Sequence, residues 1–483
     1  MNKNVALDRV CCYNVLTEIT TKTERLKGCE KMKEAKRSTF SGRIGFVLAA
    51  AGSAVGLGNL WRFPYLAAKY GGGIFLLIYI LLAVTFGFTL MITEIAIGRK
   101  THRSPMEAYG ILNKKWKWLG TLSTLVPVII LPYYCVIGGW VIKYAAVMLM
   151  GKVQEAAGTD YFTSFISQPI EPLIWFFIYA TATAAIVFLG VDKGIEKMSR
   201  YLMPALLLLT VALTIFVVCQ PGALDGVIYY IKPDFSKLNV MTFVAALGQL
   251  FFSMSLAMGI MITYGSYLKK DSNITTSTRQ IEAFDTIVAF LAGLMIVPAV
   301  FVYSGGDESA LGQGPSLMFD TLPKVFAGMP FGSAVGAAFF ILVLFAALTS
   351  SVSVMEAIVA GMTDKFKMER KRAALIVYAY ALLIGIFCAF GFSIWKNFTI
   401  MDLSILDFLD FISNSVMMPI VGMLTCIFVG FVIKPKAITD EVELNGRFKE
   451  KKFYSIMVKW IAPVCIFAIL VSSVLNTLGI VTI

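Results

Sequence analysis

Long apolar segments, separated by short polar ones, run through the 483 residues of the chain. A helix needs about 20 mainly apolar residues to cross a hydrocarbon core of roughly 30 Å. Eleven segments reach that length, which predicts an all-α polytopic membrane protein with eleven transmembrane helices. The expected spans are 43–68, 73–98, 118–150, 172–190, 200–220, 240–268, 283–304, 332–362, 373–394, 403–433 and 456–480.

The first span is interrupted by glycines near its middle. The sequence AGSAVGLGNLWRFPY at 51–65 places Gly52, Gly56 and Gly58 within seven residues. Each glycine weakens a helix by about 1 kcal/mol relative to alanine and lets the backbone turn. Because lipid cannot satisfy bare peptide groups, unwound backbone at membrane depth must line a cavity inside the protein. This stretch is therefore a candidate binding site for an ion or a solute.

The sixth span is interrupted at the matching position. Its sequence GQLFFSMSLAMGIMITYGSY gathers Ser253, Ser255, Ala257 and Gly259 at mid-span. Paired broken helices, each opening a group of five spans, are typical of inverted-repeat transporters with a site at the bilayer midplane. We therefore expect a five-plus-five inverted repeat with broken helices 1 and 6. The expected segments are a cytoplasmic tail at 1–41, repeats at 42–220 and 240–433, an extracellular loop at 221–239, an extracellular lid at 305–331, a cytoplasmic loop at 434–452 and an eleventh helix at 453–483.

Composition and charge agree with a membrane protein and orient it. The chain is 58% hydrophobic and 15% charged, against about 25% charged residues in soluble proteins. With a cytoplasmic N-terminus, the segments on the inner side hold 32 lysines and arginines and those on the outer side hold 6. This asymmetry follows the positive-inside rule and places the C-terminus outside a cell (plasma) membrane. The formal charge of +12 is thus a topology signal, and no nucleic-acid partner is expected.

Several polar side chains fall inside apolar spans. Asp285 lies in the seventh span, where an acid costs about 3 kcal/mol, so we expect it to face a buried cation. The Thr-Ser-Ser sequence at 349–351 offers hydroxyls either for hydrogen bonds between helices or for an oxygen cage around an alkali cation. Glu94 is better explained as a partner for buried backbone donors than as a transport group. Of Tyr133 and Tyr134, at least one hydroxyl needs a partner or a ligand.

The inventory of reactive side chains argues against an enzyme. His102 is the only histidine, and the eight cysteines are scattered without metal spacing. A zinc site and a histidine-based catalytic triad are therefore excluded. A disulfide framework is also not expected, because four of the cysteines lie within or at the ends of apolar spans.

The motifs together resemble one family of transporters. GLGNLWRFPY following AGSAV, a Tyr-Tyr pair in the third span and Thr-Ser-Ser in the eighth are similar to the neurotransmitter:sodium symporter family, in its bacterial amino-acid transporter branch. The resemblance covers all eleven spans in order. It implies a leucine-transporter-like fold, a sodium-coupled symporter and two bound sodium ions. The first ion would be bound by Ala54, Asn59, Ser253 and Asp285, and the second by Gly52, Val55, Ala346, Thr349 and Ser350.

The resemblance also implies a substrate site and narrows its substrate. The implied contacts are Ser53, Ala54, Leu57, Gly58, Ile130, Tyr134, Phe252, Met254, Ser255, Met258 and Val354. Relatives that carry monoamines have an aspartate where this chain has Gly56, so its absence favours an amino acid. The expected side-chain contacts are apolar, and the flexible Met258 stands where the leucine transporter has phenylalanine. We therefore expect a hydrophobic amino acid, aliphatic or aromatic.

Two gates and chloride independence follow from the same resemblance. Arg62 would pair with an acid of the tenth span, for which spacing favours Asp407 over Asp410. On the inner side Arg37 could pair with Asp364, with Phe40 and Tyr267 packing nearby. Asp285 brings a permanent negative charge where many relatives have asparagine, which predicts transport without chloride. Ala257 stands where glycine is usual in the family. The resemblance therefore does not settle which backbone groups at 254–259 contact the substrate.

Two other classes of function stay open at this point. A proton-coupled amino-acid transporter would use Asp285 or Glu94 as the proton carrier. A solute sensor or a channel would bind or conduct without accumulation. The expected partners are the amino acid, sodium ions and membrane lipid. The sequence leaves open which amino acid is carried, the ion stoichiometry and the oligomeric state.

Overall fold

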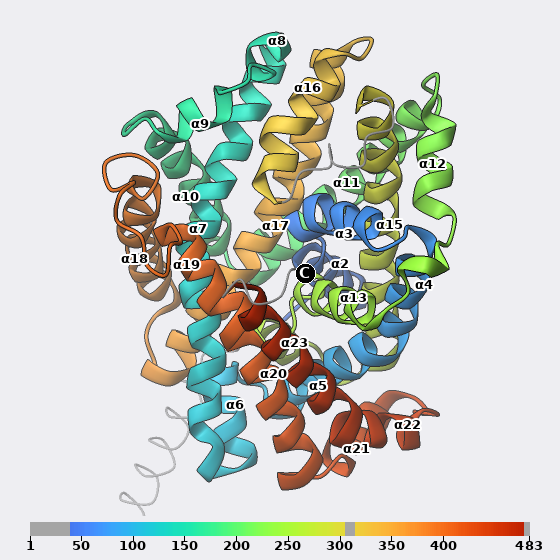
Figure 1. The fold of residues 1–483 in the computed structure, drawn as a ribbon. Helices are drawn as coiled ribbons and strands as arrows, with labels where there is room; N and C mark the ends of the chain where they lie inside the picture. Colours follow the sequence, from blue (N-terminus) through green and yellow to red (C-terminus); the bar gives the residue numbers. More distant parts are fainter. Residues whose placement is uncertain (1–38, 305–313, 478–483) are drawn as a thin grey trace, which may run out of the picture. The chain divides into compact units, whose positions relative to one another are not determined.

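The computed structural model describes residues 39–304 and 314–477, and every regular element within these ranges is a helix (Figure 1). Nine of these described helices are long and apolar enough to cross a membrane. They are Gly73–Thr101, Lys114–Leu149, Glu171–Phe188, Val191–Val218, Ile274–Ser304, Gly332–Phe366, Arg370–Phe390, Ile405–Val432 and Lys451–Thr477. The remaining two expected spans, the first and the sixth, are both broken.

The first span is bent by 53° at its glycines. Helix α2 (Arg43–Ala54) ends at Val55, whose backbone is extended, and a helical turn η1 (Gly58–Arg62) continues into α3 (Phe63–Lys69). A Cβ at Gly58 would lie 2.7 Å from the Phe252 ring, so only glycine allows that ring to approach. The break predicted from the glycines is present.

The sixth span consists of α13 (Val240–Ser253) and α14 (Ile260–Ser266) with six residues between them. Asn239 caps α13 with a capping box. In the connection Ser255, Ala257 and Gly259 all have positive φ. The Ala257 amide, which has no helical acceptor there, donates to Glu94 Oε1 at 2.7 Å. Glu94 is thus a partner for a backbone donor, as expected, and this donor belongs to the sixth span rather than to the first.

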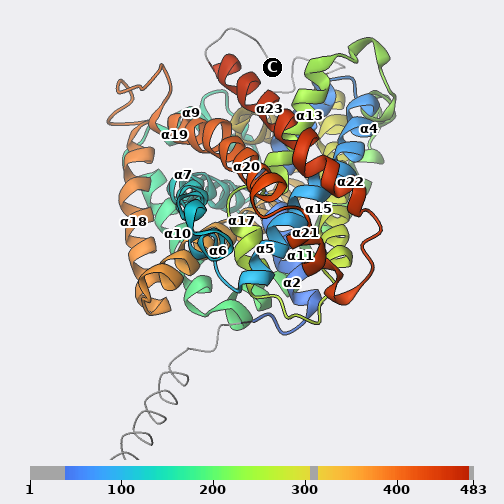
Figure 2. The same cartoon turned by 90° about the horizontal axis from the view of Figure 1, so that it is seen from below.

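Long helices enclose the two broken spans. Figure 1 shows α2, α3 and α13 at the centre, with α7 (Lys117–Leu149) and α17 (Gly332–Phe366) on one side and α15 (Ile274–Ser304) on the other. Figure 2 looks nearly along α7, which packs against α17, α10 (Glu171–Phe188) and α6 (Pro105–Leu112). The remaining spans contain α11 (Lys197–Val218), α18 (Arg370–Phe390), α19 (Ile405–Asp410), α20 (Met418–Ile427), α22 (Lys451–Ile456) and α23 (Ala462–Thr477).

The connecting segments are more ordered than their polar sequences suggest. The loop expected at 221–239 contains α12 (Ala223–Ile231). Of the lid expected at 305–331, residues 305–313 lie outside the described part, and α16 (Leu322–Ala327) packs on α8 (Val153–Ala156). The loop at 434–452 contains α21 (Lys436–Val442), which Arg99 holds through Glu441 at 2.8 Å.

Candidate functional site

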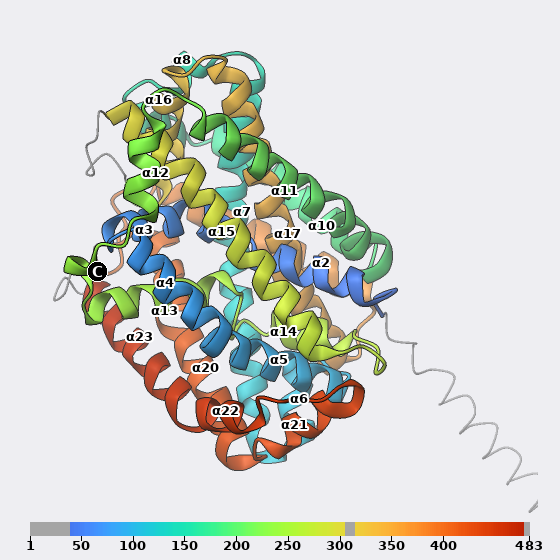
Figure 3. The ribbon, with the colours of Figure 1, turned by 90° about the vertical axis from the view of Figure 1, so that its right-hand side faces the viewer.

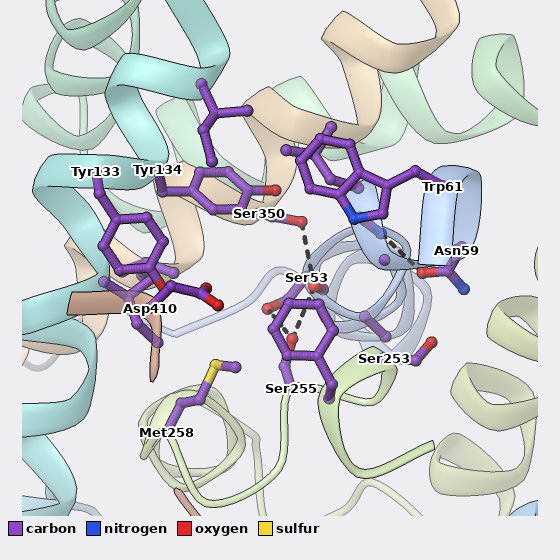
Figure 4. Close-up of a pocket in the computed structure, with 18 residues that line it drawn as sticks. Ser53, Asn59, Trp61, Tyr133, Tyr134, Ser253, Ser255, Met258, Ser350 and Asp410 are labelled. Atoms are coloured by element: carbon purple, nitrogen blue, oxygen red, sulfur yellow. Dashed lines mark hydrogen bonds between the residues drawn. The ribbon is translucent and has the colours of Figure 1, made fainter. Parts of the chain in front are cut away.

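A pocket opens at the break of the first span, between α2, η1, α7, α13, the connection from α13 to α14, α17 and the end of α19. About 600 Å³ between its lining atoms is unfilled, part of it open to solvent. Figure 4 shows the side chains around it. The lining residues are Ser53, Ala54, Gly56, Leu57, Gly58, Asn59, Trp61, Ile130, Tyr133, Tyr134, Ile137, Phe252, Ser253, Ser255, Met258, Ser350, Val354 and Asp410.

Ten of the eleven substrate contacts expected from the sequence line this pocket. The exception is Met254, which ends α13 and turns its sulfur toward Gly87. The sequence reasoning did not assign Trp61, Tyr133 and Ile137 to the pocket. Ile137 lies one turn beyond Tyr134 and two turns beyond Ile130 on α7, so helical periodicity was a signal that could have found it.

One end of the pocket is polar. The Tyr134 hydroxyl is buried beside the Ser350 hydroxyl and the Leu57 amide, and it makes no well-formed hydrogen bond among the described residues. The helix that begins at Leu57 and Gly58 presents N–H groups without intrahelical acceptors. Opposite them Ser255 Oγ donates to the Ser53 carbonyl at 2.8 Å (Figure 4). The Tyr134 hydroxyl and the helix N-terminal amides suit a carboxylate, and the serine and carbonyl oxygens suit an ammonium group.

Apart from Asn59, Tyr133, Ser253, Ser350 and Asp410, the rest of the pocket wall is apolar. Its side chains are Trp61, Ile130, Ile137, Phe252, Met258 and Val354. Met258 is 6% exposed and lies at the edge of the pocket across from Tyr134 (Figure 4). A polar solute side chain placed there would lose its hydrogen bonds to water, at a cost of about 1–3 kcal/mol.

Next to the pocket Asp285 of α15 is fully buried among the residues expected to bind the first sodium ion. Asn59 Nδ2 donates to its Oδ1 at 2.8 Å, and Ser253 Oγ donates at 2.9 Å. Tyr79 donates to Oδ2 at 3.3 Å. The structure thus brings together the side chains of α15, η1 and α13 that the sequence proposed, and adds Tyr79.

Five oxygens gather where α17 crosses the break of the first span, at the second expected sodium site. Ser350 Oγ lies 3.4 Å from the carbonyl oxygens of Gly52 and Val55. Thr349 Oγ1 lies 3.0 Å from the Ala346 carbonyl. The Thr349 hydroxyl also lies 3.0 Å from the Phe345 carbonyl oxygen, so its hydrogen bonds here are within its own helix.

On one side of the pocket the structure favours Asp410 over Asp407 as the acid facing Arg62. Asp410 lines the pocket beside Tyr133 (Figure 4) and interacts electrostatically with Arg62. Asp407 instead accepts a hydrogen bond from Ser404 Oγ at 2.6 Å. Spacing favoured Asp407, whose carboxylate is here engaged by Ser404 at the start of α19, so Asp410 is the better candidate to pair with Arg62. Arg62 also lies over the Phe252 ring, 5.8 Å from its centroid.

At the opposite end, Arg37 lies outside the described residues. Its expected partner Asp364 accepts a hydrogen bond from the Ser104 amide at 2.6 Å. Phe40 packs edge-on against Tyr267, as expected, with ring centroids 6.1 Å apart. The Tyr267 hydroxyl donates to Glu356, which also pairs with Arg370. No pattern in the sequence indicates this pair of a buried acid and a partly exposed arginine.

Comparison with known proteins identifies the family. The model of the sodium:neurotransmitter symporter family matches residues 37–164 and 166–480. An uncharacterized sodium-dependent transporter of Haemophilus influenzae is 35% identical over 91% of this chain and 98% of its own length. One of Bacillus subtilis is 33% identical over 93% of this chain and 100% of its own.

A solved structure supports the same assignment. The crystal structure of MhsT in complex with L-phenylalanine superposes with a TM-score of 0.81, at 37% identity, over 90% of this chain and 100% of that one. The family match, the relatives and this likeness agree with the broken helices and the clustered oxygens described above. The chain therefore belongs to the sodium:neurotransmitter symporter family and is a sodium-dependent membrane transporter.

Proposed function

We propose that this transporter is a symporter that imports a hydrophobic amino acid, aliphatic or aromatic, together with two sodium ions and without chloride. The observation that carries the proposal is the polarity of the pocket. Its one polar end offers the Tyr134 hydroxyl, helix amides and the Ser53–Ser255 oxygens. Most of the remaining wall is apolar, formed by Trp61, Ile130, Ile137, Phe252, Met258 and Val354. An amino acid with an apolar side chain matches this pocket, because its charged groups suit the polar end and its side chain suits the apolar wall.

The nature of the substrate is supported by three further features. Gly56 lines the pocket where an acid would be needed to balance an amine without a carboxylate. Met258 can change rotamer to admit side chains of different size. The structural neighbour MhsT was solved with L-phenylalanine, which supports an aromatic substrate for this chain.

Asp285 supports both sodium binding and independence from chloride. Its carboxylate brings a fixed negative charge to the residues of the first sodium site. A charge already present in the protein removes the need for a mobile anion. The second ion would be bound by the oxygens around Ser350, at the other side of the first-span break.

Two sodium ions supply enough energy for accumulation. At about 100 mV each entering ion contributes roughly 2.3 kcal/mol from the membrane potential alone. Two ions give about 4.6 kcal/mol, or more than a thousand-fold accumulation at about 1.4 kcal/mol per tenfold. In this proposal the chain lies in the cell membrane with its basic segments inside, and alternating access comes from rocking of one helix group against the rest.

The test is binding and uptake by purified protein. We expect one or more hydrophobic amino acids, out of the twenty, to bind in sodium and not in potassium. In proteoliposomes the same solute should accumulate against its gradient, with equal rates in chloride and gluconate. Uptake driven by a pH step without sodium would support proton coupling, and binding without accumulation would support a sensor or a channel. Either outcome contradicts the proposal.

A further inference from the structure

At the end of the molecule where the chain enters α2, a buried carboxylate ties that helix to α11. Glu196, the last residue of the turn η4 (Val191–Glu196), directly precedes α11 and is 2% exposed. Its Oε2 accepts a hydrogen bond from the Ser41 amide at 2.8 Å, and its Oε1 accepts one from the Ser41 hydroxyl. Figure 3 shows α2 beside α11 at this end. One carboxylate thus binds both donors of the residue that leads into the first span.

The carboxylate of Glu196 is aimed at the first span by its surroundings. Arg200, one turn further along α11, donates to Glu196 Oε1 at 2.7 Å and to Ser41 Oγ at 3.1 Å. On the side of α2, a Cβ at Gly45 would lie only 2.2 Å from Glu196 Oε1. Any larger residue at position 45 would displace the carboxylate, because that space is already filled. Arg200 and Gly45 therefore hold Glu196 within reach of Ser41.

A second attachment holds the same part of the chain from the other side. The Phe40 amide donates to the Tyr267 carbonyl at 3.2 Å, and Lys269 Nζ donates to the Ser41 carbonyl at 3.0 Å. Tyr267 and Lys269 follow α14, the second half of the broken sixth span. Lys269 is exposed, whereas Glu196 is buried, and contacts of exposed charges contribute little to stability. Glu196 is therefore the stronger of the two attachments.

The first half of the first span fills the space between the substrate pocket and this end of the molecule. The pocket lining begins at Ser53, so the earlier residues of α2 lie outside it. Phe46 and Ala49 are 0% and 1% exposed. Further along, a Cβ at Gly52 would lie 3.0 Å from Met203 Sδ of α11. A route from the pocket to this end therefore requires α2 to move away from α11.

The contact between Glu196 and Ser41 can also be released. Hydrogen bonds to a charged acceptor are stronger than those between neutral groups, so separation of α2 from α11 removes two favourable bonds from Glu196. Arg200, whose side chain is 55% exposed, stays with Glu196 and links it to the accessible surface. Water at this surface can replace the two lost donors after the separation. The contact thus resists the movement of α2 without making it irreversible.

We propose that Glu196 is a positioning residue of the transport cycle. Through Ser41 it keeps α2 against α11, and it thereby holds closed the route from the substrate pocket to this end of the molecule, the inner end in the proposed orientation. The contact is distinct from the expected pair of Arg37 and Asp364, because it joins the first span to α11 rather than to α17. The proposal does not depend on which solute or how many ions the transporter carries.

Labelling of an introduced thiol tests the proposal. Met203→Cys places a thiol against Gly52, eleven residues beyond Ser41, or about 16 Å along a helix. Fraying of the first turn of α2 does not expose this thiol, whereas movement of the whole helix does. A water-soluble maleimide is added to the purified full chain, and mass spectrometry measures the labelling of the peptide that contains position 203.

In this background Glu196→Gln should raise the rate of labelling about tenfold, the effect of removing the charge of the acceptor. Asp192→Asn, a change of an exposed acid in the same turn, is the matched control and should keep the parental rate. Cys388, buried in α18, reports unfolding and should be labelled at an unchanged rate in every variant. A parental rate in Glu196→Gln would overturn the proposal, and an equal rise at Cys388 would show a merely structural role and also overturn it.

A second variant covers the case in which Glu196→Gln does not fold. Ser41→Ala removes only the hydroxyl donor, at an exposed position where the change is mild. We expect about a threefold rise in the rate of labelling, since the amide of residue 41 still donates to Glu196. Thr39→Ala, which removes an exposed hydroxyl two residues earlier, should keep the parental rate. Equal rates in these two variants would contradict the proposed role of Glu196.

Discussion

Asn59 donates a hydrogen bond from Nδ2 to Asp285 Oδ1 at 2.8 Å, joining residues 226 positions apart in the chain. Both residues are fully buried. The bond ties the unwound part of the first span to α15 and orients one carboxylate oxygen. Because the amide of Asn59 is a donor here, its own Oδ1 is left to accept from the Gly56 amide at 3.1 Å. The side chain of Asn59 thus fixes both the break and the acid.

The Asp285→Asn variant should become dependent on chloride. The change keeps the size of the side chain and removes its charge, so a mobile anion must supply that charge for sodium to bind. We expect uptake to be stimulated by chloride and the half-saturating sodium concentration to rise about tenfold. Uptake of labelled amino acid in chloride and gluconate checks this. Asp225→Asn on α12, an exposed acid, should change neither property.

Ser350→Ala should weaken sodium binding at the second site. The variant removes the hydroxyl that lies 3.4 Å from two first-span carbonyl oxygens. The loss of one ligand is expected to raise the half-saturating sodium concentration about tenfold, with a smaller effect on substrate affinity in saturating sodium. Ser351→Ala is the control, because that hydroxyl contacts Tyr179 and Thr183 instead. Equal effects of the two variants would contradict the assignment.

The sequence predicts the fold well because its signals are local. The apolar run at 118–150 becomes α7 at Lys117–Leu149, and the glycines at 56 and 58 coincide with the first-span break. Small and polar residues mark the second break, yet they do not determine its backbone. Ala257 adopts a φ of 61°, a conformation that costs a non-glycine residue about 1–2 kcal/mol. The hydrogen bond to Glu94 holds it there, and no local pattern indicates that contact.

The site is harder to predict because contacts between helices decide it. Asp407 and Asp410 are three residues apart on one helix face, so periodicity cannot choose between them. A capping signal could have helped, since Ser404 and Asp407 form the start of α19. Trp61 reaches the pocket because of the bend between Ala54 and Gly58, and the turn after Ser253 removes Met254 from it. Both effects follow from backbone geometry.

Tyr134→Phe should reduce substrate affinity selectively. The hydroxyl is buried without a well-formed hydrogen bond, and in the proposed complex it donates to the substrate carboxylate. Hydrogen bonds to charged groups contribute about 1.5–3 kcal/mol, so the dissociation constant should rise at least about tenfold. Equilibrium binding in saturating sodium measures it. Tyr133→Phe is the matched control, because its hydroxyl already contacts Ser413 and Asn414. A larger loss of affinity in the control would contradict the proposed role.

Met258→Phe should shift the preference of the transporter toward smaller side chains. The rigid ring would fill space that the flexible thioether can vacate. We expect the affinity for phenylalanine and tryptophan to fall relative to that for valine and leucine, by about tenfold in the ratio. Competition of each amino acid against a labelled substrate measures the ratio. An unchanged ratio would show that the aromatic side chain does not reach this wall.

Asp410→Asn should impair transport more than binding, and Asp407→Asn should impair neither. Asp410 interacts electrostatically with Arg62 beside the pocket, whereas Asp407 is held by Ser404. Closing the pocket requires the two charges to approach, and removal of one charge leaves Arg62 unpaired in a low-dielectric setting. We expect at least a tenfold loss of the uptake rate, with sodium-dependent binding retained within about threefold. The rate is measured in proteoliposomes and the binding in detergent. If Asp407→Asn shows the larger loss of rate, Asp407 rather than Asp410 pairs with Arg62 when the pocket closes.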